Sequence, residues 1–318
     1  MRADTKSVTV DGRGRHGSWN FFRGRREESL FFILALAPGL LLFLVLIGYA
    51  LLNLALLSFQ QVSTLNIRSG AFVGLATYQE VLGRPETWNA VRNSLVWIGG
   101  SVVTITVLGV GVGVFLSRST VIARVTRAFM LVPWVLPGVV VAALWKWVYG
   151  SQTGILNSFL IQTELLDRGF PWLGNLSTAL FAVIVTMSWR LFPLFGLVVA
   201  SAINTVDRQL YEAGRLDGAS PWQAFWHITL PVIRPQTLTM ILLSTIWVAN
   251  NLVFVHVMTG GGPLRASEIL PVYLYRLAFQ NYALGESAVV SIINVLILLI
   301  IGFLYVRNLR RQVQVSFL

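Results

Sequence analysis

Residues that could perform chemistry are few in this chain, and they do not cluster. It has no cysteine, which excludes disulfides, thiolate nucleophiles and cysteine-bearing zinc sites. Its three histidines, His16, His227 and His256, lie far apart and have no adjacent acid. A phosphate-binding loop needs a lysine directly after a glycine, and neither Lys6 nor Lys146 follows one. The sequence therefore predicts no catalytic centre, no metal site and no ATP site of this type.

The composition indicates a membrane protein. Apolar residues make up 55% of the 318 residues and charged residues only 12%, whereas a soluble domain carries about 25% charge. The apolar residues form six blocks, each long enough for the roughly 20 helical residues that cross a bilayer. These predicted spans are residues 30–59, 94–116, 128–149, 179–202, 237–258 and 287–305. We expect an all-α membrane protein with a basic tail over residues 1–29 and a six-span domain over residues 30–318.

The predicted spans place more of the basic residues on one side of the membrane than on the other. Of the 24 lysines and arginines, sixteen fall on the side of the two termini and six on the other side, with Lys146 and Arg190 inside spans. Cytoplasmic loops carry the excess of such residues, so both termini are expected in the cytoplasm. This excess of basic residues on the cytoplasmic side accounts for most of the net charge of +11. No nucleic acid is therefore expected as a partner. All acidic residues lie outside the spans, which disfavours a carrier driven by protons or sodium.

The segment between the fourth and fifth spans, residues 203–235, has the pattern of two short capped helices, and we call it the elbow. Asp207 can cap the first helix, which is expected to end at Gly218 because glycine suits a left-handed helix end. Ser220 has the spacing of a capping box for the second helix, which Pro231 is expected to end. An amphipathic loop lying on the bilayer is the alternative. Small residues and exposed aromatic side chains favour a docking element for another protein.

The elbow resembles the coupling loop of permease subunits of binding-protein-dependent ABC importers. That signature is Glu-Ala-Ala, three residues, Gly, nine residues and Ile-x-Leu-Pro. The same spacing occurs here as Glu212-Ala213-Gly214, Gly218 and Ile228-Thr229-Leu230-Pro231. Gly214 replaces the usual alanine, a change expected to weaken the helix by about 1 kcal/mol. Further segments resemble the carbohydrate-uptake branch, similar to maltose and multiple-sugar permeases: Leu216-Asp217-Gly218-Ala219 and Thr259-Gly260-Gly261-Gly262-Pro263.

The resemblance implies a six-span permease of the bacterial inner membrane that works in a complex. Its partners would be membrane lipid, a second similar permease, a dimer of cytoplasmic ATPase subunits, an extracytoplasmic solute-binding protein and a small sugar. ATP and Mg would bind to the ATPase subunits, so this chain would hold no cofactor and would not be an enzyme. The elbow would dock on an ATPase subunit and drive alternating access. The residues assigned to this coupling are Tyr211, Glu212, Ala213, Gly214, Asp217, Gly218, Ala219, Ile228, Leu230 and Pro231.

Polar residues inside the spans nominate a path for the solute, because they are costly in a bilayer. Residues at positions 244, 247, 248 and 251 recur at helical spacing in the fifth span. An aromatic plane beside amides and a hydroxyl suits a sugar, although serine and asparagine also pack membrane helices together. The resemblance adds the stretch 189–194. The pathway residues are thus Trp189, Arg190, Leu194, Ser244, Trp247, Val248, Asn250 and Asn251.

Three alternatives remain open. Arg190 either lines the path, donating to hydroxyls or to an anionic group, or pairs structurally with a backbone carbonyl or the partner permease. If Arg190 binds an anionic group, the solute would be a glycerol phosphate or a phosphodiester instead of a sugar. In a different class, the chain would be a membrane docking or signalling protein whose elbow binds another partner.

Overall fold

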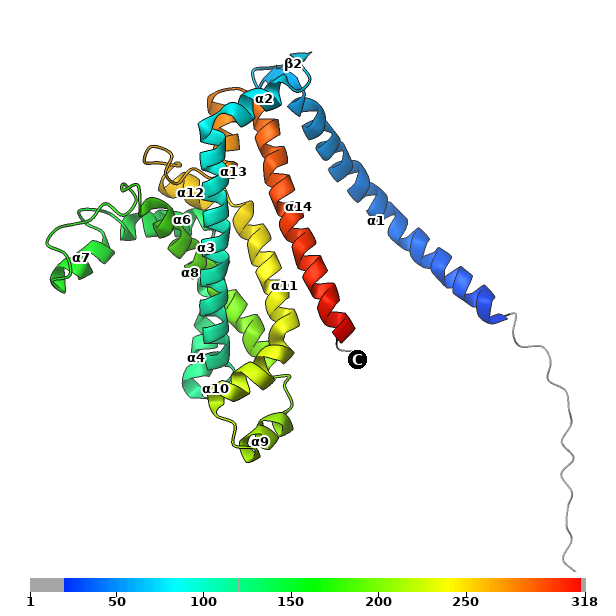
Figure 1. The fold of residues 1–318 in the computed structure, drawn as a ribbon, viewed down its shortest axis with the longest axis vertical. Helices are drawn as coiled ribbons and strands as arrows, with labels where there is room; N and C mark the ends of the chain where they lie inside the picture. Colours follow the sequence, from blue (N-terminus) through cyan, green and yellow to red (C-terminus); the bar gives the residue numbers. More distant parts are fainter. Residues whose placement is uncertain (1–19, 119, 316–318) are drawn as a thin grey trace, which may run out of the picture. The chain divides into compact units, whose positions relative to one another are not determined.

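The computed structural model describes residues 20–118 and 120–315, and they are almost entirely helical (Figure 1). Two compact units are distinguished, one up to Leu54 and one from Ala55 onward. Most of the basic tail predicted over residues 1–29 lies outside the described residues, and residues 20–29 belong to the first helix. The helices are α1 (Asn20–Ser58), α2 (Ala76–Gly83), α3 (Pro85–Leu116), α4 (Val121–Phe129), α5 (Val132–Val135), α6 (Gly138–Val148), α7 (Ile155–Gln162), α8 (Ala179–Ile203), α9 (Arg208–Leu216), α10 (Pro221–Ala224), α11 (Leu230–Ala249), α12 (Val253–Met258), α13 (Leu270–Tyr275) and α14 (Leu284–Val315), with the π-helical turns η1 (Phe225–Thr229) and η2 (Arg276–Gln280).

Five helical stretches of the described chain are long and apolar enough to cross a membrane, and a bent pair of helices can supply a sixth span. The five are Leu36–Ser58, Pro85–Leu116, Ala179–Ile203, Pro221–Ala249 and Leu284–Arg307. They coincide with the first, second, fourth, fifth and sixth predicted spans. The predicted helical membrane fold is therefore confirmed.

The third predicted span, residues 128–149, is not one helix. Val121–Val135 and Gly138–Val148 are bent by 99° relative to each other. The break lies at Leu136 and Pro137, where Leu136 is extended with ψ 138°. Proline has no N–H to donate and its ring disfavours helical backbone in the residue before it. The apolar block alone did not predict this bend, although its prolines mark the place.

The fifth predicted span, residues 237–258, is also interrupted. α11 ends at Ala249, Asn250 is its C-cap, and α12 starts at Val253. The side chain of Asn251 accepts a hydrogen bond from the backbone N–H of Phe254 at 3.2 Å and so supports the start of α12. The prediction that Asn251 shares a continuous helix face with Ser244 is therefore wrong.

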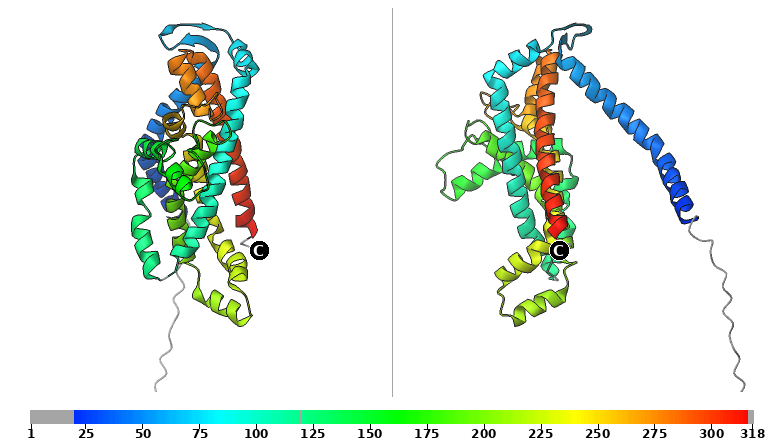
Figure 2. Two further views of the ribbon diagram at one scale, coloured as in Figure 1. Left: turned by 90° about the vertical axis from the view of Figure 1, so that its left-hand side faces the viewer. Right: turned by 45° about the vertical axis from the view of Figure 1, so that its right-hand side comes forward.

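The core of the second unit is built around the close packing of α3 against α8, which lie side by side in Figure 2. A Cβ atom added at Gly109 would approach the ring of Phe195 to 2.5 Å, and one at Gly113 would approach Val199 to 2.5 Å. Small residues at such positions allow membrane helices to approach closely. A buried tryptophan joins α11 to this pair, since Trp97 Nε1 donates to the carbonyl of Val248 at 2.9 Å.

The end of the spans opposite the elbow contains an antiparallel hairpin of β1 (Gln60–Ser63) and β2 (Asn66–Phe72), which the sequence did not predict. The hydroxyl of Thr64 ties it to the carbonyl of Ala278 at 2.6 Å. Beside the hairpin, the guanidinium of Arg84 pairs with the carboxylates of Glu286 and Glu80. The hydrogen bond that Arg84 donates to the carboxylate of Glu286 is the largest cause of a raised pKa at Arg84. These contacts fix α2 and the start of α3 to the start of α14.

A buried ion pair anchors the segment that follows the Gly260-Gly261-Gly262-Pro263 turn. Glu268, 2% exposed, accepts from Arg276 Nε at 2.7 Å. Ser94 accepts from the backbone N–H of Leu270 at 2.7 Å, and Asn93 donates to the carbonyl of Glu268 at 3.2 Å. This network joins α3 to α13, and sequence reasoning missed it because its members are far apart in the chain.

Candidate functional site

The first half of the elbow is a capped helix, as predicted. The carboxylate of Asp207 accepts a hydrogen bond from the backbone N–H of Gln209 at 2.9 Å at the start of α9. At the other end Gly218 has φ +80°, in the left-handed region that glycine adopts without strain. The backbone N–H of Ala219 then returns to the carbonyl of Gly214 at 2.8 Å, which closes the helix end.

The second half of the elbow begins as predicted but does not end as predicted. Ser220 and Gln223 form a capping box. The side chain of Ser220 accepts a hydrogen bond from the backbone N–H of Gln223, and the side chain of Gln223 accepts one from the backbone N–H of Ser220. The chain then continues through the π-helical turn η1 into α11, so Pro231 does not stop the helix. Pro231 lies directly after η1 inside the continuous helical stretch Pro221–Ala249. Because proline has no N–H, one preceding carbonyl lacks its helical partner there. The elbow is thus continuous with the fifth span.

The two halves of the elbow are joined by two contacts. The hydroxyls of Tyr211 on α9 and Thr229 at the end of η1 are hydrogen-bonded at 2.8 Å. A Cβ atom at Gly214 would lie 3.1 Å from the end of the Ile228 side chain. Gly214 is therefore a point of close approach, which is a physical reason for glycine where the resembling signature has alanine.

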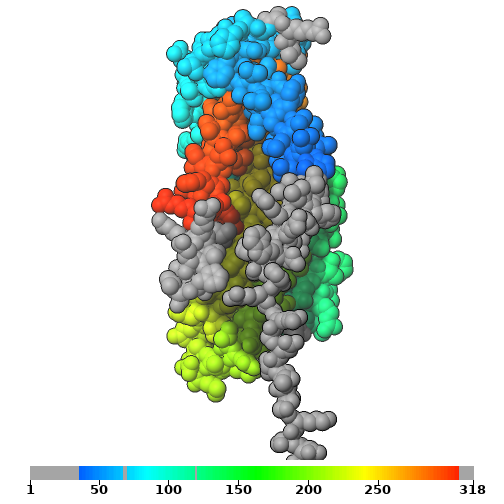
Figure 3. Space-filling view, turned by 90° about the vertical axis from the view of Figure 1, so that its right-hand side faces the viewer, coloured from blue at the N-terminus to red at the C-terminus, as the bar shows by residue number. Residues whose placement is uncertain are grey.

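The outward surface of the elbow is apolar and acidic. Leu216 is 90% exposed, and Leu210 and Trp222 are also exposed. Glu212 and Asp217 lie at the surface, and their side chains take part in no ion pair of the described residues. The space-filling view shows this segment in yellow-green at the surface (Figure 3). Exposed apolar side chains beside charges are typical of a docking surface.

The coupling residues are divided between this surface and the interior of the elbow. Tyr211, Gly214 and Ala219 are half-buried. Ile228 lies within the turn η1, and Leu230 and Pro231 directly follow it. Glu212, Ala213, Asp217 and Gly218 are exposed. The first group holds the elbow together and the second is accessible from outside.

A pocket of about 460 Å³ lies between α5, α8 and α11. It brings together four of the eight predicted pathway residues: Arg190, Trp247, Asn250 and Asn251. Four further lining residues were not predicted: Trp134, Met187, Leu191 and Ile246. Trp134 reaches the pocket because the third span is broken. Pro133 and Pro137 were the residues from which this break could have been predicted.

The other four predicted pathway residues do not line this pocket. Ser244 and Val248 are buried on another side of α11, at 1% and 0% exposure. Trp189 packs its ring 5.5 Å from that of Trp145, edge to face, and Leu194 packs against the core. The helical spacing predicted correctly that Trp247 faces a pocket. It was wrong to put Ser244 and Val248 on the same face, because their buried side chains pack the helices together.

Arg190 connects the two helix breaks. Its Nη2 lies 3.4 Å from the carbonyl oxygens of both Trp134 and Leu136, at the break in the third span. Its guanidinium carbon lies 5.9 Å from the ring centre of Phe254, directly after the break in the fifth span. Its Nε is buried without a hydrogen-bond partner in the described structure. The contacts support the structural role in which Arg190 pairs with backbone carbonyls.

With both the elbow and the pocket placed, comparison with known proteins defines the family. A family model described as "Binding-protein-dependent transport system inner membrane component" matches residues 105–315, well over half of the chain. The chain belongs to this family. It is thus the inner-membrane permease subunit of an ABC importer, and ATP hydrolysis resides in partner subunits.

Individual relatives support this assignment. The chain is 31% identical over 291 residues to the diacetylchitobiose uptake system permease protein DasB of Streptomyces coelicolor, covering 87% of this chain and 88% of the relative. It is 32% identical over 225 residues to the trehalose/maltose transport system permease protein MalF of Thermococcus litoralis, covering 71% and 74%. A crystal structure of a bacterial alginate ABC transporter, with 20% identity, has a similar fold at a TM-score of 0.75 and covers 92% of this chain and 97% of that chain.

Proposed function

We propose that this permease moves a sugar or an oligosaccharide across the inner membrane by alternating access. The pocket between the spans carries the proposal, because it presents the indole of Trp247 beside the amides of Asn250 and Asn251. The apolar face of a sugar packs on an aromatic ring while amides bond to its hydroxyls. Relatives named for diacetylchitobiose uptake and for trehalose/maltose transport are consistent with this solute class.

The environment of Arg190 favours a neutral solute over a glycerol phosphate or a phosphodiester. Its contacts are two carbonyl oxygens and an aromatic face. These groups partly compensate the charge of the guanidinium within the chain.

We further propose that the elbow docks on one subunit of an ATPase dimer, with the coupling residues named above at or beneath the contact. A second permease would complete the membrane part, and a solute-binding protein would deliver the sugar from outside. Both termini would lie in the cytoplasm. Continuity of the elbow with α11 supports a lever, because a rotation of α10 is transmitted directly to the helix that bears Trp247.

Co-purification of the tagged chain from its native membrane tests the assembly. We expect an ATPase, a second permease and a binding protein whose unfolding temperature rises with one sugar. Recovery of the chain with an unrelated partner would instead support the docking or signalling class.

The pocket is tested in the same reconstituted complex. Trp247→Leu is expected to reduce sugar-stimulated ATPase activity about two- to tenfold, since loss of a stacked aromatic contact costs about 0.5–1.5 kcal/mol. Trp147→Leu is the matched control, because Trp147 is exposed on α6 and does not line the pocket. Equal activity of the two variants, with equal assembly, would contradict the assignment.

A further inference from the structure

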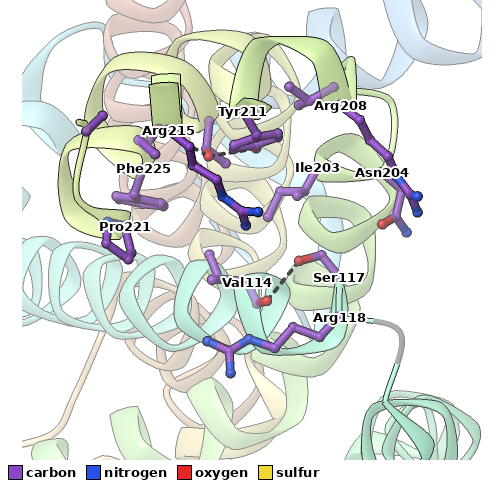
Figure 4. Close-up of a pocket in the computed structure, with 14 residues that line it drawn as sticks. Val114, Ser117, Arg118, Ile203, Asn204, Arg208, Tyr211, Arg215, Pro221 and Phe225 are labelled. Carbon is purple, nitrogen blue, oxygen red and sulfur yellow. Dashed lines mark hydrogen bonds between the residues drawn. The ribbon is translucent and has the colours of Figure 1, made fainter. Parts of the chain in front are cut away.

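A second pocket, of about 550 Å³, lies between the elbow and the nearest ends of two spans (Figure 4). Three of its lining residues are arginines: Arg118, Arg208 and Arg215. No acidic residue lines it, and none of the three arginines belongs to an ion pair of the described residues. The lining of the pocket is therefore positively charged.

The arginines come from opposite walls of this pocket. Arg118 follows the end of α3, whereas Arg208 and Arg215 lie seven residues apart on one face of α9. Figure 4 shows Arg215 extending from α9 toward the end of α3. Asn204, directly after α8, adds an amide to the same lining. A ligand in the pocket would therefore bridge the elbow and the spans.

The chemistry of the lining suits a phosphate group. Guanidinium groups bind phosphate through paired N–H donors, and several together neutralise its charge. Tyr211 is already bonded to Thr229, so its hydroxyl stiffens the wall rather than providing a free donor. The arginines and the amide supply the free donors.

The place of the pocket at the ends of two spans favours a lipid as the source of the phosphate. One wall is made by Ser117 and Arg118, which directly follow the span ending at Leu116, and by Asn204, which directly follows the span ending at Ile203. These residues lie at the elbow-side ends of the two spans, on the side of the membrane proposed to be cytoplasmic. On the cytoplasmic side that leaflet carries anionic lipids, and basic pockets between helix ends bind their headgroups.

The residues assigned to the ATPase docking surface do not line the pocket. Leu216, 90% exposed, and the acidic side chains of Glu212 and Asp217 are on α9 and its end but do not line the pocket. Arg208 and Arg215 line the α9 wall of the pocket and lie four and three residues from Glu212, so the pocket and the docking surface adjoin on α9. Binding of a partner carboxylate by the arginines is therefore an alternative outcome of the test.

We propose that the pocket formed by Arg118, Arg208, Arg215 and Asn204 binds the phosphate of an anionic phospholipid and thereby ties the elbow to the ends of α3 and α8. The assignment to lipid rests on the proposed cytoplasmic position of the elbow. α9 is otherwise held mainly by the Tyr211 hydrogen bond and the Gly214 contact. A bound headgroup would strengthen this attachment, so anionic lipid would improve coupling between ATP hydrolysis and the spans.

Lipid retention by the full-length chain, purified with its partners, tests this proposal without any sugar. Native mass spectrometry would compare bound phosphatidylglycerol with bound phosphatidylcholine. Arg118→Gln combined with Arg215→Gln is expected to weaken phosphatidylglycerol binding roughly tenfold or more, since each lost charged hydrogen bond is costly. Replacement of both by lysine keeps the charge but not the paired donors, and is expected to have a smaller effect.

The matched control removes the same charge from the same side of the protein. Arg124→Gln combined with Arg307→Gln changes two arginines that do not line the pocket, and normal phosphatidylglycerol binding is expected. Equal losses in both double variants would overturn the proposal, because general surface charge would then explain the binding. Displacement of lipid by inorganic phosphate at millimolar concentration would overturn the lipid source. If the pocket variant loses the ATPase subunit but retains phosphatidylglycerol normally, the arginines bind a carboxylate of that partner and the lipid proposal is wrong.

This outcome is independent of the sugar assignment. A chain that retains phosphatidylglycerol through the arginines but shows no sugar-stimulated activity supports the pocket and contradicts the sugar. A chain that shows sugar-stimulated activity but no selective lipid retention supports the sugar assignment and contradicts the lipid pocket.

Discussion

Gly218 is the residue on which the turn between α9 and α10 depends. Its φ of +80° costs an L-residue about 1 kcal/mol or more. We expect Gly218→Ala to lower the thermal stability of the elbow and to reduce sugar-stimulated ATPase activity of the complex. Gly218→Asn is the control, since asparagine enters the left-handed region more readily, and a milder loss is expected. Wild-type activity in both variants would show that the turn is not needed for coupling.

Tyr211 and Glu212 are neighbours in sequence but have different roles in the structure. Tyr211 bonds internally to Thr229, whereas Glu212 is exposed. We expect Tyr211→Phe to destabilise the chain by about 1 kcal/mol, and Thr229→Val to add little in the double variant because the same bond is already lost. Thermal unfolding of the single and double variants measures this. Additive losses would mean that the two hydroxyls act separately.

Glu212→Gln is expected to leave the unfolding temperature unchanged and to weaken binding of the ATPase. Co-purification at increasing salt measures that binding. A fall in stability with unchanged ATPase binding would contradict a docking role for this carboxylate.

At the scale of elements, the contact between α3 and α8 carries the core. Gly109→Ala would place a Cβ atom 2.5 Å from the ring of Phe195, and overpacking of this kind costs about 1–3 kcal/mol. Gly111→Ala is the matched control in the same helix, because a Cβ atom there meets nothing within 4 Å. Unfolding in detergent should therefore separate the two variants. Equal stability would mean that α3 and α8 can move apart without loss.

The elements of the fold were predicted to different extents from the sequence. Hydropathy located all six apolar blocks, and local capping residues such as Asp207 and Ser220 predicted both starts in the elbow, because these signals depend only on nearby residues. At the bend of the third span, the carbonyls of Trp134 and Leu136 are contacted by the distant Arg190, which nearby residues do not predict. The π-helical turn before Pro231 had no local signal that we recognised in the sequence. The hairpin of β1 and β2 is likewise fixed by contacts with residues more than 200 positions away.

The candidate pocket was predicted only in part for the same reason. Trp247 follows from the composition of its helix, but which face of α11 meets the pocket depends on the neighbours of that helix. Val248 is fully buried, and its backbone carbonyl accepts a hydrogen bond from Trp97 of α3, so this side of α11 packs into the core. The arginine pocket at the elbow was not predicted, since Arg118 and Arg215 meet only when α3 and the elbow are both in place.

At the scale of the whole molecule, the proposed orientation places the elbow in the cytoplasm and the segment after α12 outside. The absence of cysteine makes this directly testable. Leu216 in the elbow and Leu264 after the glycine turn are each 90% exposed, so a cysteine at either position should react equally well with a thiol reagent that reaches it.

With a membrane-impermeant maleimide on cells whose outer membrane, if present, is permeabilised, we expect Leu264→Cys to be labelled and Leu216→Cys to be protected. In inverted membrane vesicles the pattern should reverse. Added ATPase subunits should then slow labelling of Leu216→Cys, because that side chain lies on the proposed docking surface. Since equal exposure removes reactivity as an explanation, labelling of Leu216→Cys from outside would invert the proposed topology and with it the lipid leaflet assigned to the arginine pocket.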